Sequence, residues 1–264
     1  MIYTCYEMIR DCRADKSEGW SFFLAQYVPV IRRLLAHYFP DRAADPALIE
    51  RVLSALRQTQ SGLFESLDPA PERAFVAALR QRVLAAVEAD RAGAAPEVSI
   101  DLEVLGRALE PLTLTERLAV WFETMYYGPA DAARMLRMSP QTAEKIRSRA
   151  DELVRATVDA WSARLLADNG PSLGREAAAL ATQDCLPPKA FLDIIDGRTN
   201  WRGREEMERH VKTCWHCLDH FCRLLEVVDM LRASQPLADA ELENYQLLLG
   251  VLPPKRSFWK KLAG

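Results

Sequence analysis

Apolar residues recur along most of this chain at the three- and four-residue spacing of an amphipathic helix. Residues 20–39 begin this pattern and end at a Pro-Asp pair. Residues 46–58 follow, with a proline in the first turn behind an aspartate that can cap the helix. Residues 72–90 place Phe and aliphatic side chains at every fourth position. No stretch shows the apolar–polar alternation of a half-buried strand, so we predict an all-α fold.

Two breaks in the helical pattern indicate a division into domains. Residues 91–96 (RAGAAP) are small or helix-breaking and are typical of a linker. An Asn-Gly-Pro sequence at 169–171 interrupts a second helical region. We therefore expect a helical domain at 1–92, a second domain at 97–168, a small domain at 183–232 and a tail at 233–264.

The second domain carries the pattern of a helix-turn-helix. A short helix containing Ala132 and Ala133 precedes a sharp turn, and small residues there let two helices cross closely. Ser139 can cap the next helix, and Pro140 suits its first turn. The apolar positions of this helix predict a buried stripe that consists of Ala143, Ile146, Ala150 and Leu153.

The opposite face of this second helix is polar and is the expected DNA-contacting face. A recognition helix lies in the major groove, with its first residues near base edges and its basic side chains near phosphates. The residues predicted to contact DNA are Gln141, Thr142, Lys145, Arg147, Ser148 and Arg149. An ordinary helical hairpin with a solvated charged face stays open as an alternative, because helix-turn-helix patterns are degenerate.

Residues 109–155 resemble the C-terminal promoter-binding domain of extracytoplasmic-function sigma factors. The matching features are Glu116-Arg117, a Gly-containing turn, Asp131-Ala132-Ala133, the Ser-x-x-Thr helix start at 139–142 and Arg149-Ala150. Residues 1–92 are similar to the N-terminal helical domain of that family. The resemblance covers residues 1–166 and implies a transcription-initiation regulator that binds core RNA polymerase and promoter DNA.

Two departures from the sigma pattern favour a second hypothesis. The helix at 46–58 corresponds to the one that grips the polymerase clamp in that family, and it lacks the family's Gln. The helix at 72–90 carries Ala and acidic residues where the family places Trp, Asn and basic residues. A degenerate sigma-like scaffold, or an anti-sigma regulator without promoter recognition, is therefore the alternative function.

Charge is balanced along the chain, whereas cysteine and histidine are not. The 264 residues include 34 Lys and Arg against 37 Asp and Glu, so the bulk charge attracts neither nucleic acid nor membrane. The longest uncharged apolar stretch, at 20–31, is too short to span a membrane, and the N-terminus carries no secretory signal. We expect a cytoplasmic protein without stable membrane insertion, in which clustered thiols favour metal binding over disulfides.

Most of the cysteines and histidines lie between residues 185 and 222, where they form the pattern of a structural zinc site. The spacing His-x3-Cys-x2-Cys brings three ligands to one point, and a cysteine upstream can reach them as the fourth. Neutral imidazole and thiolates are ligands that Zn²⁺ prefers. The predicted Zn²⁺ ligands are Cys185, His210, Cys214 and Cys217. The substitutes for the fourth ligand are His216, His220 and Cys222.

Residues 185–232 resemble the zinc-binding anti-sigma domain, a small helical unit. In that family an upstream Cys or His precedes an Asp-Gly element, here Asp196-Gly197, and the His-x3-Cys-x2-Cys motif follows. Such domains bind sigma factors by packing helices between the two sigma domains. The resemblance implies that residues 183–232 restrain the sigma-like part, through contact within the chain or with another sigma factor.

Other interpretations of the C-terminal third stay open. The residues at 214–217 also have the C-x-x-C form of thiol-disulfide oxidoreductases, or the cysteines are small buried residues without a metal. Residues 253–264 carry four basic residues and no acid, and they are either a solvated end or an anchor for anionic lipid. No nucleophile–base pair, phosphate loop or acid–base dyad is visible, so we expect no enzymatic activity.

Overall fold

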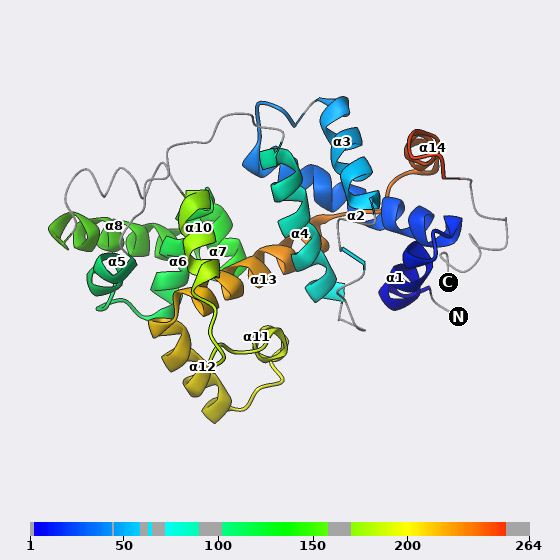
Figure 1. Ribbon diagram of the computed structural model, residues 1–264. Helices are drawn as coiled ribbons and strands as arrows, with labels where there is room; N and C mark the ends of the chain where they lie inside the picture. Colours follow the sequence, from blue (N-terminus) through cyan, green and yellow to red (C-terminus); the bar gives the residue numbers. More distant parts are fainter. Residues whose placement is uncertain are drawn as a thin grey trace. The chain divides into compact units, whose positions relative to one another are not determined.

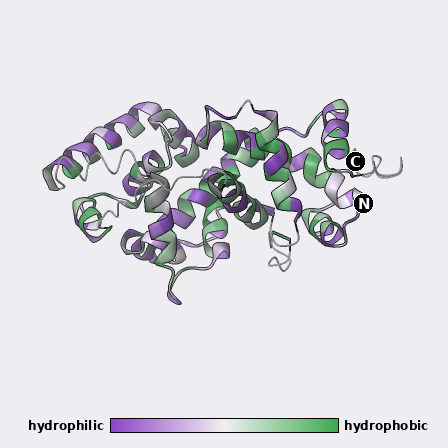
Figure 2. Ribbon diagram, turned by 45° about the horizontal axis from the view of Figure 1, so that its top comes forward, coloured by the Kyte–Doolittle hydropathy of each residue, from purple (hydrophilic) through white to green (hydrophobic). Residues whose placement is uncertain are grey.

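Every regular element in the described part of the chain is a helix (Figure 1). The computed structural model describes residues 3–43, 45–58, 63–64, 72–89, 102–157 and 170–251. The predicted all-α class is confirmed. The linker expected at 91–96 and the basic segment at 253–264 lie outside these residues. Hydrophilic and hydrophobic residues alternate around most of the helices, as the amphipathic pattern predicts (Figure 2).

The chain divides into two compact units. One unit combines residues 1–93 with residues 227–264, and the other consists of residues 94–226. Residues 183–226 therefore share their unit with the segment that carries the predicted helix-turn-helix, and the chain after residue 226 shares its unit with the N-terminal helices. Among the described helices, none combines the length and apolarity that a membrane crossing requires.

The first unit is built around one long helix, which supplies much of its buried aromatic and aliphatic core. Its N-terminal helices are α1 (Cys5–Arg13), α2 (Ser17–Tyr38), α3 (Pro46–Arg57) and α4 (Glu72–Ala89). Its C-terminal elements are the end of α13 (Trp215–Ala233) and α14 (Asp239–Leu248). The side chain of Asp45 caps α3 by accepting the N–H of Ala47, and Pro46 occupies the first turn.

An interior proline of α2 explains how the C-terminal segment attaches to this helix. Pro29 has no N–H, so the carbonyl of Ala25 lacks its usual partner four residues later in the helix. The backbone N–H of Leu237 donates to that carbonyl at 2.9 Å. The proline thus leaves a buried acceptor on α2, and the chain just before α14 satisfies it.

The second unit contains the segment with the predicted helix-turn-helix and the cysteine-rich segment. Its first four helices are α5 (Leu102–Ala108), α6 (Leu114–Thr124), α7 (Pro129–Leu136) and α8 (Pro140–Thr157). The next are α10 (Gly170–Ala179), α11 (Pro188–Ile195), α12 (Trp201–Thr213) and the first part of α13. Helix α6 contacts α7 and α8 as well as α10 and α12, so it is central to this unit (Figure 1).

A sharp turn joins α7 and α8 at the position where the sequence predicts one. Ala132 and Ala133 are buried. Arg137 adopts the left-handed conformation with φ of 55°, and this ends α7. The hydroxyl of Ser139 accepts the N–H of Thr142 at 3.1 Å, which is the geometry of an N-cap.

Candidate metal centre and recognition helix

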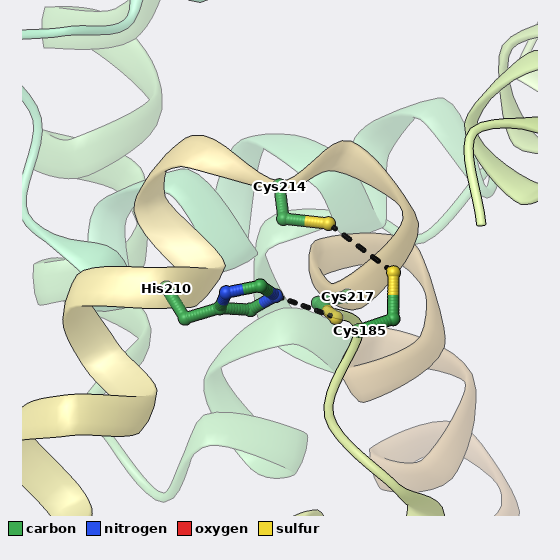
Figure 3. Close-up of side chains that lie close together, drawn as sticks. All are labelled: Cys185, His210, Cys214 and Cys217. Carbon is green, nitrogen blue, oxygen red and sulfur yellow. Dashed lines mark hydrogen bonds between the residues drawn. The ribbon is translucent and has the colours of Figure 1, made fainter. Parts of the chain in front are cut away.

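Four side chains from three parts of the second unit converge (Figure 3). Cys185 lies in the loop before α11, His210 in the last turn of α12, Cys214 at the end of α12 and Cys217 at the start of α13. Their ligand atoms all lie within 4.8 Å of one another. The Sγ atoms of Cys185 and Cys214 are 3.8 Å apart, and Nε2 of His210 is 3.2 Å from Sγ of Cys217.

These separations fit a tetrahedral zinc ion. Zinc bonds of about 2.3 Å to sulfur and about 2.0 Å to nitrogen place two sulfur ligands about 3.8 Å apart, and a sulfur and a nitrogen about 3.5 Å apart. A closed Cys3His set leaves no open position for a substrate and is typical of a structural site. The cluster could therefore hold a metal ion, and its donors and spacing are compatible with zinc.

The turn at Cys214 brings the ligands together. Its N–H donates to the carbonyl of His210 at 3.0 Å, and its own carbonyl accepts the N–H of Leu218 at 3.0 Å. Cys214 therefore ends α12 and begins α13. Its backbone is extended, with φ of −112° and ψ of 107°, and this single residue separates the two helices. The ligands therefore converge across a turn at Cys214 and not along one continuous helix.

Backbone N–H groups point at two of the sulfur atoms. The N–H of Thr182 donates to Cys185 at 3.3 Å and lowers the pKa of that thiol. The N–H of Leu186 donates to Cys217 at 3.4 Å. Cys217 is fully buried, and burial raises the pKa of its thiol to about 12. A thiolate at Cys217 therefore needs a nearby positive charge, which a bound metal supplies.

The three substitutes for the fourth ligand lie outside this cluster. Nδ1 of His216 is 3.2 Å from the carbonyl oxygen of Ala178. The ring of His220 packs edge-on against Phe191, and burial lowers the pKa of this histidine to about 4. Cys222 is buried, and its thiol donates to a backbone carbonyl of α6. Among the candidates for the fourth position, the structure thus places Cys185 beside His210, Cys214 and Cys217.

The polar face of α8 is exposed, as the sequence pattern predicts. The exposed residues include all six that were predicted to contact DNA: Gln141, Thr142, Lys145, Arg147, Ser148 and Arg149. The predicted stripe is buried at Ala143, Ile146 and Ala150 and half-buried at Leu153. This arrangement leaves the side chains of one helix face accessible to a ligand.

Two of these six side chains form ion pairs with α6, which sequence reasoning missed. Arg149 lies 2.8 Å from Glu116, and Arg147 lies 3.6 Å from Glu123. Partial burial opposes ionisation of Glu116, but hydrogen bonds from Thr113 and the charge of Arg149 outweigh it and lower the pKa of this carboxyl. Burial raises the pKa of Glu123 to about 7, against the opposing charge of Arg147. Two predicted DNA contacts thus have acidic partners within the protein.

The cluster and α8 belong to one compact unit. No protein-family model, curated protein or solved structure matches this chain. A functional proposal therefore depends on the residues and contacts of the chain itself. Those contacts establish a four-residue cluster that could hold a metal, and the same unit contains α8 with its exposed polar face.

Proposed function

We propose that this chain is a sigma-factor-like regulator of transcription initiation, whose residues beyond the cysteine cluster restrain the sigma-like part of the same chain. The observation that carries the proposal is the return of the C-terminal segment. Residues 227–251 belong to the compact unit formed with residues 1–93, which are the residues similar to the N-terminal sigma domain. A segment packed there competes with any partner that binds the same helices.

Polar contacts between α14 and α2 support the restraint. The amide of Gln246 donates to the hydroxyl of Ser21 at 2.9 Å, and both residues are buried. The guanidinium of Arg32 forms an ion pair with Glu241 and lies 5.4 Å from the ring centre of Tyr245. The buried bond between Gln246 and Ser21, together with the more exposed contacts of Arg32, favours one docked position for α14.

The C-terminal segment also reaches α3, the helix that resembles the polymerase-gripping helix of sigma factors. The guanidinium of Arg57 at the end of α3 donates to the carbonyl of Leu249. A shallow pocket at this junction is lined by Ser54, Arg57, Gln58, Leu248 and Leu249. A polymerase surface that bound this end of α3 would have to displace residues 248–249.

Binding of core RNA polymerase tests the proposal. Leu242 of α14 is 1% exposed, so Leu242→Asp buries a charge and displaces α14. We expect this full-length variant to bind core polymerase at least about tenfold more tightly than the unaltered chain. Leu247 lies on the same helix and is 77% exposed, so Leu247→Asp is the matched control and is expected to bind like the unaltered chain.

Two outcomes of this experiment would contradict parts of the proposal. If neither the unaltered chain nor Leu242→Asp binds polymerase, the sigma role is wrong. If both variants bind like the unaltered chain, the sigma role stands and the restraint is wrong. Circular dichroism of Leu242→Asp establishes that the rest of the chain is folded.

The ion pairs of α8 favour the second candidate, a scaffold or anti-sigma regulator without promoter recognition. Glu116 and Glu123 neutralise two of the basic side chains on the face that would approach DNA. Titration of Leu242→Asp with duplex DNA at low salt separates the two functions. Polymerase binding without any binding to DNA, alone or with polymerase present, favours the scaffold.

A further inference from the structure

Helix α6 contacts α12, which carries part of the cysteine cluster, as well as α8. The guanidinium of Arg117 donates to the carbonyl of Lys212 at 2.5 Å, in the last turn of α12 and two residues before Cys214. The last carbonyls of a helix have no partner within the helix, and a positive charge there is favourable for the helix dipole. Arg117 therefore stabilises the end of α12 from which two ligands project.

The burial of Arg117 lowers the free energy of unfolding. The residue is buried, and in the described part of the chain its Nε has no hydrogen-bond partner. A buried guanidinium with an unsatisfied donor is destabilising by itself. Its bond to Lys212 compensates for part of this cost only while the end of α12 keeps its present position.

A second contact comes from inside the ligand loop. Trp215 lies between Cys214 and Cys217, and its ring packs against Trp121 of α6 with ring centres 5.2 Å apart. A Cβ atom on Gly106 of α5 would lie 3.5 Å from the same ring. Trp215, one of the two residues between these cysteine ligands, thus packs against α6 and α5.

Helix α13 continues these contacts beyond the ligand loop. Nε1 of Trp121 donates to Asp219 at 3.2 Å. The hydroxyl of Tyr127, in the turn before α7, donates to the buried carboxylate of Glu226 at 2.5 Å. Buried polar partners of this kind leave unsatisfied groups when the helices separate, so α13 and α6 are expected to move as one body.

The remaining face of α6 contacts the recognition helix. Glu116 and Glu123 are seven residues apart, on one face of α6, and they pair with Arg149 and Arg147 of α8. Arg117 and Trp121, four residues apart, hold the cysteine-rich segment on another face. A single helix of 11 residues therefore connects the candidate metal centre to α8.

We propose that Arg117 and Trp215 are positioning residues that tie the metal centre to α6, so that metal binding and the stability of the helix-turn-helix form one linked equilibrium. Contacts that hold the ligands in place raise metal affinity, and by reciprocity a bound metal stabilises α6 and α8. The inference rests on the candidate metal centre described above and requires neither polymerase nor DNA.

Zinc affinity of the full-length chain, measured by competition with a chromogenic chelator, is the first test. Trp215→Ala and Arg117→Ala are each expected to weaken zinc binding by about tenfold or more, the usual effect of losing a group that supports metal ligands. The matched controls are Trp201→Ala and Arg209→Ala in α12, whose side chains are exposed. Trp215→Phe keeps an aromatic ring and is expected to restore most of the affinity.

Hydrogen exchange with and without zinc is the second test. Zinc removal is expected to speed amide exchange in α8 of the unaltered chain and of Trp201→Ala by about tenfold or more. In Trp215→Ala the amides of α8 should exchange fast whether or not zinc is present. Unchanged exchange in α8 on zinc removal, or equal zinc affinity in Trp215→Ala and Trp201→Ala, overturns the coupling.

The two proposals fail in different experiments. A chain that binds no zinc overturns this coupling and leaves polymerase binding to be measured separately. A chain that binds zinc with the expected differences between variants retains the coupling even when polymerase binding is absent. Trp215→Phe and far-ultraviolet circular dichroism distinguish loss of positioning from general unfolding.

Discussion

Glu116 has two structural functions in the helix-turn-helix. Its carboxylate accepts the backbone N–H of Thr113 at 2.8 Å and completes a capping box at the start of α6. The same side chain forms the ion pair with Arg149. Glu116, which matches the sigma-factor pattern, thus pairs with Arg149, a residue that the sequence predicts to contact DNA.

Removal of Glu116 is expected to destabilise the unit of residues 94–226. Glu116→Ala loses the reciprocal cap and a partly exposed ion pair, which together contribute about 1 to 2 kcal/mol. Urea unfolding of the full chain, followed by exchange of α6 amides, measures the loss. The control is Glu103→Ala, which breaks an exposed pair with Arg107 and is expected to cost less than about 0.5 kcal/mol. Equal losses in the two variants would contradict this account.

Glu123 should make stability depend on pH. Its pKa is raised from 4.5 to about 7 by burial, with Asp151 and Glu144 adding repulsion and Arg147 opposing. The folded protein then binds this proton more tightly than the unfolded chain, so stability falls as pH rises from 4.5 to about 7 and is constant above. After allowance for solvent screening, the decrease is about 1 to 3 kcal/mol.

Glu123→Gln is the variant that measures this pH dependence. The amide stays neutral, so unfolding curves at several pH values should lose the decrease between pH 4.5 and about 7. The exposed Glu103→Gln is expected to keep it. A decrease of the same size in Glu123→Gln would assign the pH dependence to another group.

Among the helices, α2 shows how a backbone carbonyl that a proline leaves unpaired becomes the acceptor for a distant segment. Pro29 frees the carbonyl of Ala25, and Leu237 uses it. The helical pattern of residues 20–39 predicted the helix correctly. It did not indicate the partner of that carbonyl, because the N–H that satisfies it comes from a distant part of the chain.

Pro29→Ala should loosen the C-terminal segment while leaving α2 intact. The restored N–H at position 29 shares the Ala25 carbonyl and weakens its bond to Leu237 by up to about 1 kcal/mol, or roughly fivefold in the opening equilibrium. Faster exchange of the Leu237 amide measures this change. Pro46→Ala is the control, because an N–H in the first turn of α3 has no helical acceptor to take. Unchanged exchange at Leu237 would exclude this role for Pro29.

At the scale of the whole molecule, α13 belongs to both compact units. Its residues up to 226 belong to the unit of residues 94–226, and those from 227 onward belong to the unit that contains the N-terminal helices. The helix begins directly after Cys214, so the candidate metal centre defines its N-terminus. A change at the cluster is therefore expected to affect the start of α13.

Metal content tests this organisation most directly. The full chain is expected to bind one zinc ion, and Cys214→Ala and Cys185→Ala are each expected to lose it, with a lower unfolding temperature for residues 94–226. Cys222→Ala is the matched control, because this cysteine is buried outside the cluster and should leave zinc bound. Zinc retained by Cys185→Ala and lost by Cys222→Ala would assign the fourth ligand to Cys222.

The sequence by itself determined the features that depend on local spacing. Helical class, the buried stripe at Ala143, Ile146 and Ala150, and the convergence of His210 with two cysteines follow from residues a few positions apart. These contacts are set by the period of the helix and by one turn, so a linear pattern contains them.

The contacts between residues distant in the chain depend on the tertiary structure. The arrival of Cys185 at the cluster, the pairing of Arg147 and Arg149 with α6, the packing of Trp215 on Trp121 and the return of α14 to α2 join residues far apart in the chain. The spacing of apolar residues along each helix does not indicate which distant residues pair. They result from the complementary packing of whole helices, in which each buried polar group takes the partner that the fold places beside it.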